Sequence, residues 1–558
     1  MQQETEPGVP VVQVETRRAP AMRFLGAVWA VLGWLLVALG AVLFGSALWI
    51  RQTFGPISVD QMLMHLPGAG GGDAEATPEG YLSSFVVQAL VIPLAAVGAL
   101  LSLALLVRRR PKRDRRSYAV PPRPSRAALL WRRIRARHWA RPVLAVAACV
   151  AGGAVFAQAV QAPQYVQSIT TPMTLEDYYV APEAGGAVST VGDPRSGEER
   201  KNLVLIYLES MEDAFSDAEL MGENLLEPVE EATEGWGTIP ALRQYEGGGW
   251  TMSGIVGSQC GVPLRGAGYT PRERNDIGEG EDDYLPGAVC LGDVLDGAGY
   301  TSVFMGGAHE QFASKGVYLR NHGYDTVKDA NHWIAQGETE YSVWGLSDAR
   351  LMENAKAEVD ELHASGRPFN LTLLTLDSHE PAHLFDHCPQ TTEEPLSSAI
   401  KCSMSEVAGF VEHMESQGYL DDTVVVLVGD HEKMVGEDRP YWSELGDLQG
   451  RTIFNRIWSP DGVGDLRSVD QLSLYPTLLD LLDLGRPDHR AGVGVSALVD
   501  ETASTSILDL SPDEYREVVN SRSFELYQRL WGLEGPGGGG TDRPAEAGER
   551  AGSQPVEE

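Results

Sequence analysis

The chain has 558 residues, 43% of them hydrophobic, and a formal net charge of −34. This length exceeds that of one ordinary domain. The acidic excess lies mostly after residue 163 and argues against nucleic acid as a partner, although such a charge otherwise describes a solvated surface.

Three uncharged apolar segments stand near the amino terminus, at about residues 24–50, 82–107 and 142–162. Each is long enough to cross roughly 30 Å of hydrocarbon, so each predicts a transmembrane helix. A cleaved signal peptide would explain only the first segment, which is long for that role and lacks a clear small-residue cleavage site. Buried helices of a soluble domain are the weaker alternative for three such segments in succession.

The charges between these segments predict how the chain is oriented in the membrane. Residues 108–141 are rich in Arg and Lys and contain one acidic residue, Asp114. Because basic loops stay in the cytoplasm, we expect residues 1–23 and this loop inside and everything after about residue 163 outside. The basic loop also suits nucleic acid, but beside two spans it more often marks topology and contact with anionic lipids. The sequence thus predicts a multi-pass protein of the cell membrane with its large domain on the extracytoplasmic side.

The rest of the chain predicts a tether at 163–200, a domain at 201–532 and a disordered tail at 533–558. In the domain, short β-rich runs alternate with helical patterns, which is typical of an α/β fold with a mixed, mostly parallel sheet flanked by helices. We expect strands at 202–208, 301–305, 369–376 and 423–428. We expect helices at 291–298, 347–363, 403–417, 473–484 and 511–531, the last capped by Ser511 ahead of Pro512.

Four of the five cysteines lie in the region expected outside, and Cys149 lies in the third span. An even number of exported cysteines predicts two disulfides in an oxidising compartment. Of the three possible pairings we favour Cys260–Cys290 and Cys388–Cys402. The spacing contains no Cys-x-x-Cys element, which argues against a structural zinc site.

Two of the expected strands run directly into acidic residues. The strand 202–208 is followed by Glu209, and the strand 423–428 is followed by Gly429, Asp430 and His431. Open α/β sheets place their sites beyond the carboxyl ends of the strands, so these side chains predict a site for one divalent cation. A mixed set of oxygen and nitrogen ligands suits Mn²⁺ best, with Mg²⁺ or Zn²⁺ possible. The alternatives are a helix cap or surface Glu209 and a surface turn at Asp430.

A Gly-rich segment between these strands, residues 253–261, offers a nucleophile. We favour Ser258, as nucleophile and as fourth ligand, because coordination to a cation would lower the pKa of its hydroxyl. A helix that begins in this segment would also point its amides at an anion. The rivals are Thr251, Ser253 and Cys260, and Cys260 is disfavoured if it forms a disulfide, because only a thiolate attacks.

Three further residues are candidates for substrate binding. His379 follows the strand expected at 369–376 and is suited to bind a substrate oxygen or to protonate a leaving group. Lys315 offers a point charge to a phosphate, and His309 is a weaker candidate of the same kind. An inert loop histidine and a plain surface lysine are the alternatives.

Four motifs in fixed order resemble a known family. They are NLVLIYLES at 202–210, the run from Trp250 to Pro263 with its Ser-Gln-Cys-Gly element, LDSHEP at 376–381, and Gly-Asp-His at 429–431. Together they resemble the membrane-anchored phosphoglycerol transferases, which include lipoteichoic acid synthase, within the alkaline phosphatase and sulfatase superfamily. The resemblance covers roughly residues 200–490 and implies a sulfatase-like catalytic domain.

The resemblance also implies roles for individual residues. In that family a Glu, a hydroxyl residue and an Asp-His pair bind one manganese ion, and the hydroxyl residue takes up phosphoglycerol covalently. By resemblance these roles fall on Glu209, Ser258 and the pair Asp430-His431, with His379 as the substrate-binding histidine. Two features depart from the synthases: Phe312 to Lys315 stands where they place a Trp-Asn-Arg element, and three spans are expected where they usually have five.

Three functions are compatible with these features. The first, implied by the resemblance, is metal-dependent transfer of glycerol phosphate from phosphatidylglycerol to an extracellular glycan or glycolipid through a phosphoserine. The second is a sulfatase, phosphodiesterase or phosphatase acting on extracytoplasmic esters, although the Cys-x-Pro-x-Arg signature of sulfatases is missing because Cys260 to Arg265 is one residue too long. The third is a non-catalytic protein that binds the cell wall or a partner.

Overall fold

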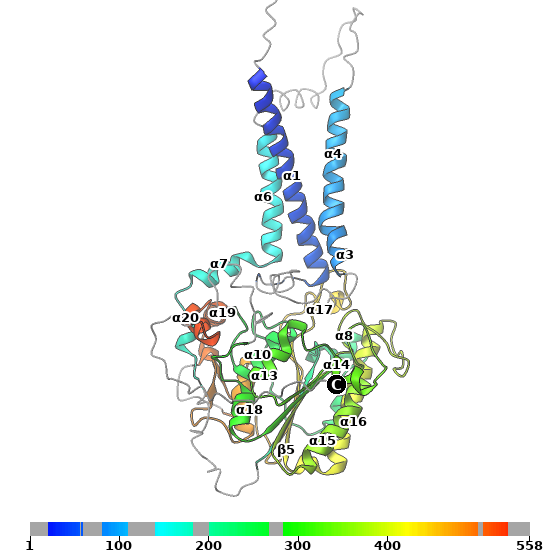
Figure 1. Ribbon diagram of the computed structural model, residues 1–558, viewed down its shortest axis with the longest axis vertical. Coiled ribbons are helices and arrows are strands. Elements are labelled where there is room, and N and C mark those ends of the chain that lie inside the picture. The colour runs from blue at the N-terminus through cyan, green and yellow to red at the C-terminus, as the bar shows by residue number, and fades with distance from the viewer. Residues whose placement is uncertain are drawn as a thin grey trace, which may run out of the picture.

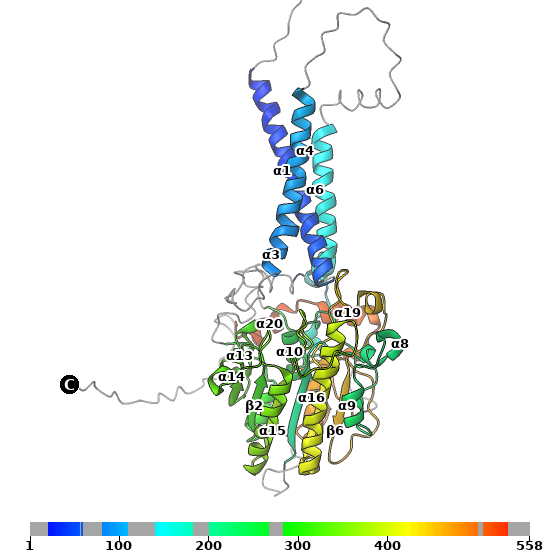
Figure 2. The same cartoon turned by 90° about the vertical axis from the view of Figure 1, so that its right-hand side faces the viewer.

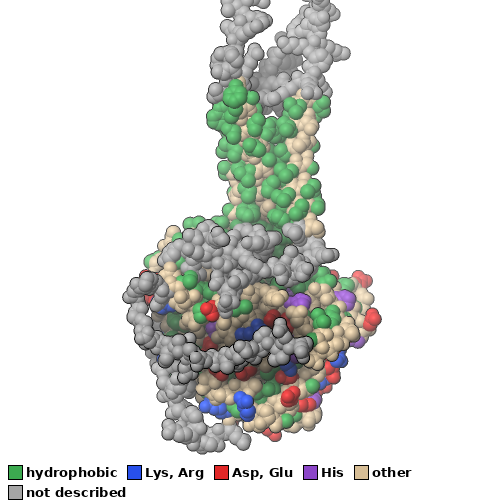
Figure 3. Space-filling view, in the orientation of Figure 1, with side chains coloured by type: hydrophobic (Ala, Val, Ile, Leu, Met, Phe, Trp, Pro, Cys, Tyr) green, Lys and Arg blue, Asp and Glu red, His purple; other side chains and the backbone are tan. Residues whose placement is uncertain are grey.

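Three apolar helices stand at the amino-terminal end of the chain (Figure 1). The computed structural model describes residues 20–55, 57, 59, 81–109, 140–181, 200–266, 283–499 and 506–533. The helices are α1 (Pro20–Thr53), α4 (Ile92–Arg109), which continues α3 (Tyr81–Phe85) and the π-helical turn η1 (Val86–Val91), and α6 (Ala140–Ala159). Their apolar stretches Ala27–Thr53, Ser83–Leu106 and Pro142–Ala159 are long enough to cross a membrane, so the three predicted apolar helices are confirmed. Figure 3 shows apolar side chains covering these helices and charged side chains on the domain below.

The domain is built on a six-stranded sheet with the strand order β3-β2-β4-β1-β5-β6. Every residue of the central strands is buried, as expected for strands covered on both faces. The strands are β1 (Asn202–Leu208), β2 (Thr301–Gly306), β3 (Thr326–Lys328), β4 (Phe369–Leu374), β5 (Thr423–Gly429) and β6 (Asn455–Trp458), and a separate hairpin joins β7 (Arg490–Ala491) to β8 (Gly494–Val495). Only β6 runs antiparallel in the large sheet, so the predicted mixed, mostly parallel sheet is confirmed.

Helices cover both faces of this sheet, and alternate residues of β1 point to opposite sides. Leu203 and Leu205 pack in one core with α10 (Thr251–Cys260), α12 (Leu291–Gly297) and α18 (Leu474–Leu481). Val204 and Ile206 pack in a second core with α9 (Glu227–Ala232), α15 (Asp348–Ala364) and α16 (Pro395–Gln417). In Figure 2, α15 and α16 lie side by side along the sheet.

The other helices are α7 (Ala162–Thr170), α8 (Ala218–Met221), α13 (Lys315–Asn321), α14 (Ala330–Gln336), α17 (Trp442–Leu445), α19 (Pro512–Asn520) and α20 (Phe524–Leu530). The short helical turns are η2 (Leu175–Asp177), η3 (Asp213–Ser216), η4 (Phe312–Ser314), η5 (Tyr419–Asp421), η6 (Gln471–Ser473) and η7 (Ile507–Asp509).

Two predicted helices differ from the observed ones. The helix expected at 403–417 begins at Pro395, because Glu394 caps it by accepting a hydrogen bond from the Leu396 amide. The single helix expected at 511–531 is two helices, α19 and α20, separated by residues 521–523, where Ser523 has a φ of 39°. The predicted cap Ser511 is confirmed, since its side chain accepts from the Glu514 amide.

The segment expected as a tether is partly folded. Its first part forms α7 and η2, and Val180 pairs with Gly492 beside the hairpin β7–β8. Residues 182–199 of the tether, residues 110–139 of the basic loop, residues 1–19 and residues 534–558 of the tail lie outside the described residues. Predictions for these four segments therefore stay predictions.

Among the described residues, α1 and the helix α7 that follows α6 both contact the domain. The end of α1 contacts the segment that follows β5: Arg51 forms an ion pair with Glu437 at 3.0 Å, and its carbonyl accepts from the Glu437 amide at 3.2 Å. On the other side α7 contacts α19, and the Arg522 amide just beyond α19 donates to the Ser168 carbonyl at 2.9 Å. The helices thus stand over the edge of the sheet to which the carboxyl end of β5 leads (Figures 1 and 2).

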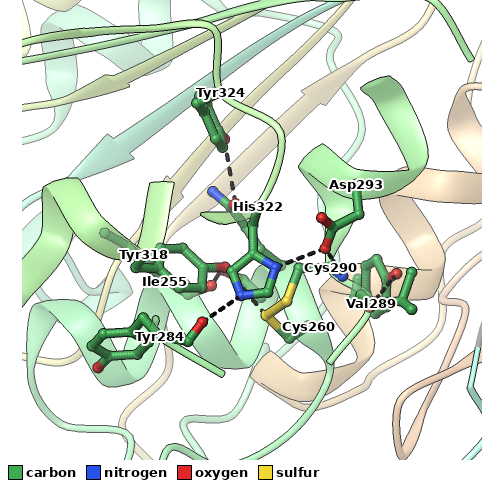
Figure 4. Close-up of a disulfide and its surroundings, with 12 residues drawn as sticks. Ile255, Cys260, Tyr284, Val289, Cys290, Asp293, Tyr318, His322 and Tyr324 are labelled. Carbon is green, nitrogen blue, oxygen red and sulfur yellow. Dashed lines mark hydrogen bonds and ion pairs between the residues drawn. A yellow bond between two sulfur atoms is a disulfide. The ribbon is translucent and has the colours of Figure 1, made fainter. Parts of the chain in front are cut away.

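The two predicted disulfides are confirmed as Cys260–Cys290 and Cys388–Cys402. Figure 4 shows the first, which joins the last residue of α10 to the residue that caps α12. Beside it His322 is held between the Asp293 carboxylate at 2.7 Å and the Tyr284 carbonyl at 3.0 Å. The disulfide therefore fixes the carboxyl end of α10 in a fully packed region.

Candidate metal and catalytic site

Three predicted ligands converge beyond the carboxyl ends of β1 and β5. These strands are parallel neighbours in which Leu208 pairs with Gly429, so Glu209 and Asp430 follow side by side. One ligand atom from each of Glu209, Asp430 and His431 lies within 4.8 Å of the others. All three side chains are buried, with 3%, 1% and 2% of their surface exposed. Charged groups this deeply buried require a counter-charge or a cation.

The hydrogen bonds around this cluster leave Oδ2 of Asp430 and Nε2 of His431 available to a cation. Oδ1 of Asp430 accepts from the amides of Ser210 and His431, at 2.8 and 2.9 Å. Its Oδ2 is buried without a hydrogen-bond partner among the described residues. Nδ1 of His431 donates to the Glu432 carbonyl at 2.8 Å, which directs Nε2 toward the carboxylates at 3.6 and 3.8 Å. A histidine fixed through one nitrogen in this way presents the other as a metal ligand.

The pKa values in the cluster also fit a cation site. Burial and the neighbouring charge of Glu209 raise the pKa of Asp430 to about 7. Burial acts in the same direction on Glu209, but the charges of His379 and His431 lower its pKa to about 2. Two carboxylates that compete for charge in one buried place are stabilised together by a divalent cation. The residues present therefore form a candidate metal site, with oxygen and nitrogen donors suited to Mn²⁺, Mg²⁺ or Zn²⁺.

Two hydroxyl groups lie beside this cluster: that of Ser210, which donates to Oε1 of Glu209 at 2.6 Å, and that of Thr251, the first residue of α10. Its Oγ1 donates to Oε2 of Glu209 at 3.3 Å. Ser258 lies seven residues further along the helix, about 10 Å away at the ordinary helical rise. Its hydroxyl donates to the Gly254 carbonyl at 2.7 Å and shares a hydrogen bond with the Tyr207 hydroxyl at 2.7 Å. Ser258 therefore lies in the third turn of α10, away from the candidate ligands beside the first residue of the helix.

The other rivals for the nucleophile are also accounted for. Ser253 is fully buried, and its hydroxyl donates to the Gly247 carbonyl at 2.8 Å. Cys260 is in the disulfide with Cys290. Of the four candidate nucleophiles, only Thr251 lies in the pocket beside Glu209.

The amino end of α10 lies against the strand end that carries Asp430. A Cβ at Gly254 would lie 1.9 Å from the Asp430 carbonyl oxygen, so only glycine permits this approach of helix and strand end. The same carbonyl accepts from Nε2 of Gln471 at 2.5 Å. The first amides of α10 have no partner within the helix and lie at the helix end that carries Thr251, which favours an anion there.

A pocket with about 830 Å³ of empty space, including its open part, joins this cluster to the surface. Its lining includes the three predicted substrate-binding residues, Lys315, His379 and His309, together with Glu209 and Thr251. Lys315 is 4% exposed, and burial lowers its pKa to about 8. Burial also lowers the pKa of His379, so that its imidazole is neutral over more of the neutral range.

Buried acids hold the loop that carries His379. Asp348, the first residue of α15, accepts from the amides of Leu376 and Asp377 at 2.7 and 3.0 Å and from the Ser403 hydroxyl at 2.7 Å. Oδ2 of Asp377 in turn accepts from the Asp348 amide at 2.9 Å. Burial raises the pKa of both carboxyls, and the charge of Asp348 raises that of Asp377 further.

Sequence reasoning missed two residues of the site. The ring centres of Trp344 and His379 lie 3.9 Å apart with the ring planes tilted by 52°, and Nε1 of Trp344 donates to the Glu380 carbonyl at 3.1 Å. Lys433 is 5% exposed, pairs with the Glu380 carboxylate at 3.1 Å and lowers the pKa of Glu209. The only signal for Lys433 is its place two residues after His431, and Trp344 lies in a segment without a motif.

Comparison with known proteins bears on this site. A family model described as Sulfatase matches residues 201–484. Phosphoglycerol transferase I of Xanthomonas campestris pv. campestris (strain B100) is 39% identical over 346 residues, which is 60% of this chain and 47% of that protein. Phosphoglycerol transferase I of Escherichia coli O139:H28 is 29% identical over 351 residues, or 60% of this chain and 42% of that protein. The chain thus spans about half the length of the curated relatives it matches.

Two solved structures share parts of the arrangement. The lipoteichoic acid synthase LtaP from Listeria monocytogenes is similar with a TM-score of 0.47 and 15% identity, over 63% of this chain and 96% of that one. The lipooligosaccharide phosphoethanolamine transferase A (EptA) from Neisseria meningitidis is similar with a TM-score of 0.44 and 15% identity, over 82% of this chain and 86% of that one. Both TM-scores lie below 0.5, so neither likeness bears on the function of this chain.

Proposed function

Because the chain belongs to the sulfatase family, we propose that it is a metal-dependent transferase that moves glycerol phosphate from phosphatidylglycerol to an extracytoplasmic glycan or glycolipid. The observation that carries the proposal is the convergence of Glu209, Asp430 and His431, with the Thr251 hydroxyl 3.3 Å from Glu209. The names of the relatives from Xanthomonas and Escherichia support a phosphoglyceryl substrate.

In this proposal Thr251 replaces Ser258 as the nucleophile. A divalent cation, when bound by Glu209, Asp430 and His431, supplies Lewis-acid polarisation of a phosphoryl oxygen and a lower pKa for the hydroxyl. Thr251 Oγ1 attacks the donor phosphorus, and the Oγ1–P bond forms as the bond from phosphorus to the diacylglycerol oxygen breaks. The first amides of α10 and the Lys315 ammonium bind the phosphoryl oxygens.

His379 moves the protons of this reaction. Its Nδ1 donates to the Glu380 carbonyl at 2.8 Å, which leaves Nε2 as the proton acceptor of the neutral ring. Nε2 takes the Thr251 proton and passes it to the departing diacylglycerol oxygen. In the second half an acceptor hydroxyl gives its proton to Nε2 and attacks the phosphothreonine, and the Thr251 oxygen leaves and takes that proton. The reaction is therefore of the ping-pong type.

In our proposal, the disulfides and the basic segment 108–141 indicate on which side of the membrane the domain lies. Two disulfides in the domain suit an oxidising compartment, and the basic segment 108–141 suits the cytoplasm. Both support a catalytic domain on the extracytoplasmic side, where a glycan or glycolipid acceptor is available.

Hydrolysis of sulfate or phosphate esters is the competing function, and the description of the matching family model favours it. A cysteine nucleophile is not available at Cys260, which is in a disulfide at the far end of α10 from Glu209. A purely structural role would leave three buried ionisable groups around an unpartnered Asp430 oxygen without a purpose.

The decisive experiment uses the full chain in detergent micelles that contain phosphatidylglycerol. We expect manganese-dependent release of diacylglycerol and a glycerophosphoryl adduct on Thr251 in peptide mass spectrometry. p-Nitrophenyl phosphate and p-nitrophenyl sulfate, tested side by side, should be poor substrates. Faster cleavage of either ester than of the lipid, without an adduct, would establish a hydrolase instead, and a melting temperature that ignored Mn²⁺ would favour a non-catalytic protein.

A further inference from the structure

The pocket above the candidate metal site has two chemically different parts. Its inner part is polar and contains Glu209, Thr251, Lys315 and His379. Its mouth carries three apolar side chains, Phe312, Val343 and Trp344, which we call the lip. Phe312 and Trp344 contact each other edge to face with their ring centres 6.2 Å apart.

The lip is open to solvent in an unusual way for large apolar residues. Val343 is 70% exposed and Phe312 is 36% exposed, although both line the same pocket as the buried polar groups. A single exposed apolar residue needs no explanation, but two exposed residues beside the half-buried Trp344 at a ligand pocket mark a binding surface. The two segments that form the lip, η4 after β2 and the segment before α15, are separate in sequence and contact each other here through Phe312 and Trp344.

The contact between the domain and the end of α1 indicates which kind of molecule lies next to the lip. The segment after β5 begins with the ligands Asp430 and His431 and reaches the end of α1, where Glu437 pairs with Arg51 and Gly55 approaches the Val435 carbonyl. From His431 to Val435 the chain spans at most about 14 Å. The end of α1 is also the end of the apolar stretch Ala27–Thr53. The polar part of the pocket therefore lies a short distance from the place where the chain leaves the membrane.

We propose that the lip binds the diacylglycerol part of a membrane phospholipid. The ester region and first methylenes of the acyl chains lie against Phe312, Val343 and Trp344, while the phosphodiester extends inward to Thr251 and Lys315. The proposal rests on the proposed function, because it assigns the lip to the lipid donor of that reaction.

A sugar of the acceptor is the competing occupant, since aromatic rings also stack on sugars. Two observations favour the lipid. Val343, the most exposed member of the lip, is aliphatic and offers neither a ring face nor a hydrogen bond to a sugar. The contact between α1 and the segment after β5 places the pocket beside the bilayer, where diacyl lipids are the most abundant apolar molecules.

The first test compares donors with and without acyl chains. Val343→Ser and Phe312→Ser are made in the full chain, with Ile334→Ser as the matched control, because Ile334 is 57% exposed on α14 and is not among the residues that line the pocket. For phosphatidylglycerol in phosphatidylcholine vesicles, we expect both lip variants to raise KM by about fivefold, the effect of one to two methylenes' worth of apolar contact, with kcat unchanged. For glycerophosphoglycerol, which has no acyl chains, KM should stay at the wild-type value in all variants.

The outcomes separate the two occupants. Equal changes with both donors, or no change with either, would overturn the proposal. An increase of the acceptor KM alone would assign the lip to a sugar and would also overturn it. The Ile334→Ser variant should match the wild type throughout, and a change there would remove the evidence for the lip.

A second test does not need turnover. The full chain in nanodiscs is irradiated with phosphatidylglycerol that carries a diazirine near the start of one acyl chain, and the adducts are mapped by peptide mass spectrometry. Adducts in the peptides of Phe312 or Val343 support the lip even if the wild type releases no diacylglycerol, which would contradict only the proposed function. Turnover of phosphatidylglycerol without adducts on the lip would overturn the inference and leave the proposed function intact.

Discussion

The two ends of helix α10 carry similar residues and differ completely in what surrounds them. At the amino end the Thr251 hydroxyl faces the pocket and donates to Glu209 at 3.3 Å. At the carboxyl end Ser258 is 2% exposed and is bonded to the Tyr207 hydroxyl and the Gly254 carbonyl, both at 2.7 Å. Both ends contain hydroxyl groups near glycines, but of the two hydroxyls only that of Thr251 lines the pocket.

The difference teaches that position within the helix decides whether a hydroxyl is available for chemistry. A serine inside a helix hydrogen-bonds the carbonyl four residues before it, as Ser258 does with Gly254. A residue at the first position has no such carbonyl within the helix and lies among amides without helical partners. The amino end is therefore suited to bind an anion and the carboxyl end to hold the helix in the core.

The largest expected effect separates the two hydroxyls directly. Thr251→Ala should lower kcat for diacylglycerol release by at least about 10³-fold, because nucleophile losses of this kind are at least that large. Ser258→Ala should keep kcat within about threefold and lower the stability by about 1–3 kcal/mol, since the buried Tyr207 hydroxyl loses a partner. Both are measured with labelled phosphatidylglycerol and by thermal unfolding.

Thr251→Ser is the matched control, because it keeps a hydroxyl at the same helix position. It should retain most of the activity and form the adduct on the serine introduced there. An inactive Ser258→Ala with normal melting, or an active Thr251→Ala, would reverse the assignment of the two ends.

The second prediction concerns the cation. At a Mn²⁺ concentration 100 times its Kd, the wild type should be stabilised by about 2.7 kcal/mol. Asp430→Asn should lose most of this stabilisation, because it removes the negative charge from a candidate ligand. Oδ2 of Asp430 has no hydrogen-bond partner among the residues described. Ser258→Ala should keep it in full. The measurement is the melting temperature of the full chain in micelles with Mn²⁺ and with a chelator, and equal metal responses of wild type and Asp430→Asn would contradict the candidate site.

The sequence predicted the ligands better than the nucleophile, and the reason is geometric. Leu208 pairs with Gly429 in adjacent parallel strands, so residues that end two apolar runs meet at one edge whatever the loops do. The choice between Thr251 and Ser258 depends on where α10 begins, and the residue before it, Trp250, gives no side-chain cap that would announce a start. Trp344 and Lys433 reach the site through tertiary packing that local patterns do not record.

The carboxyl end of α10 should matter for stability and not for chemistry. Replacing both Cys260 and Cys290 by Ser removes a disulfide that closes a loop of 30 residues, which should cost roughly 3–4 kcal/mol. At a temperature where the variant remains folded, its kcat should stay close to that of the wild type. The exchange of Cys388 and Cys402 for Ser, which opens a loop of 14 residues near the His379 loop, provides the comparison. A Cys260/Cys290 variant that melts normally but has lost kcat would show that the two ends are not separate.

The smallest expected effect tests the electrostatics of the amino end. Burial lowers the pKa of Lys315 to about 8, so the ammonium is present below pH 8 and is lost as the pH rises through that value. Between pH 7 and pH 9 the cationic fraction falls by about tenfold, and the donor KM should rise by up to the same factor. Lys315→Arg stays charged throughout this range, so its KM should be flat even if it is higher at pH 7. The same exchange at Lys356, which pairs with Glu353 on the outer side of α15, should leave the wild-type pH dependence unchanged. A rise in KM that persisted in Lys315→Arg would assign the pH dependence to another group and would remove Lys315 from the anion site at the amino end of α10.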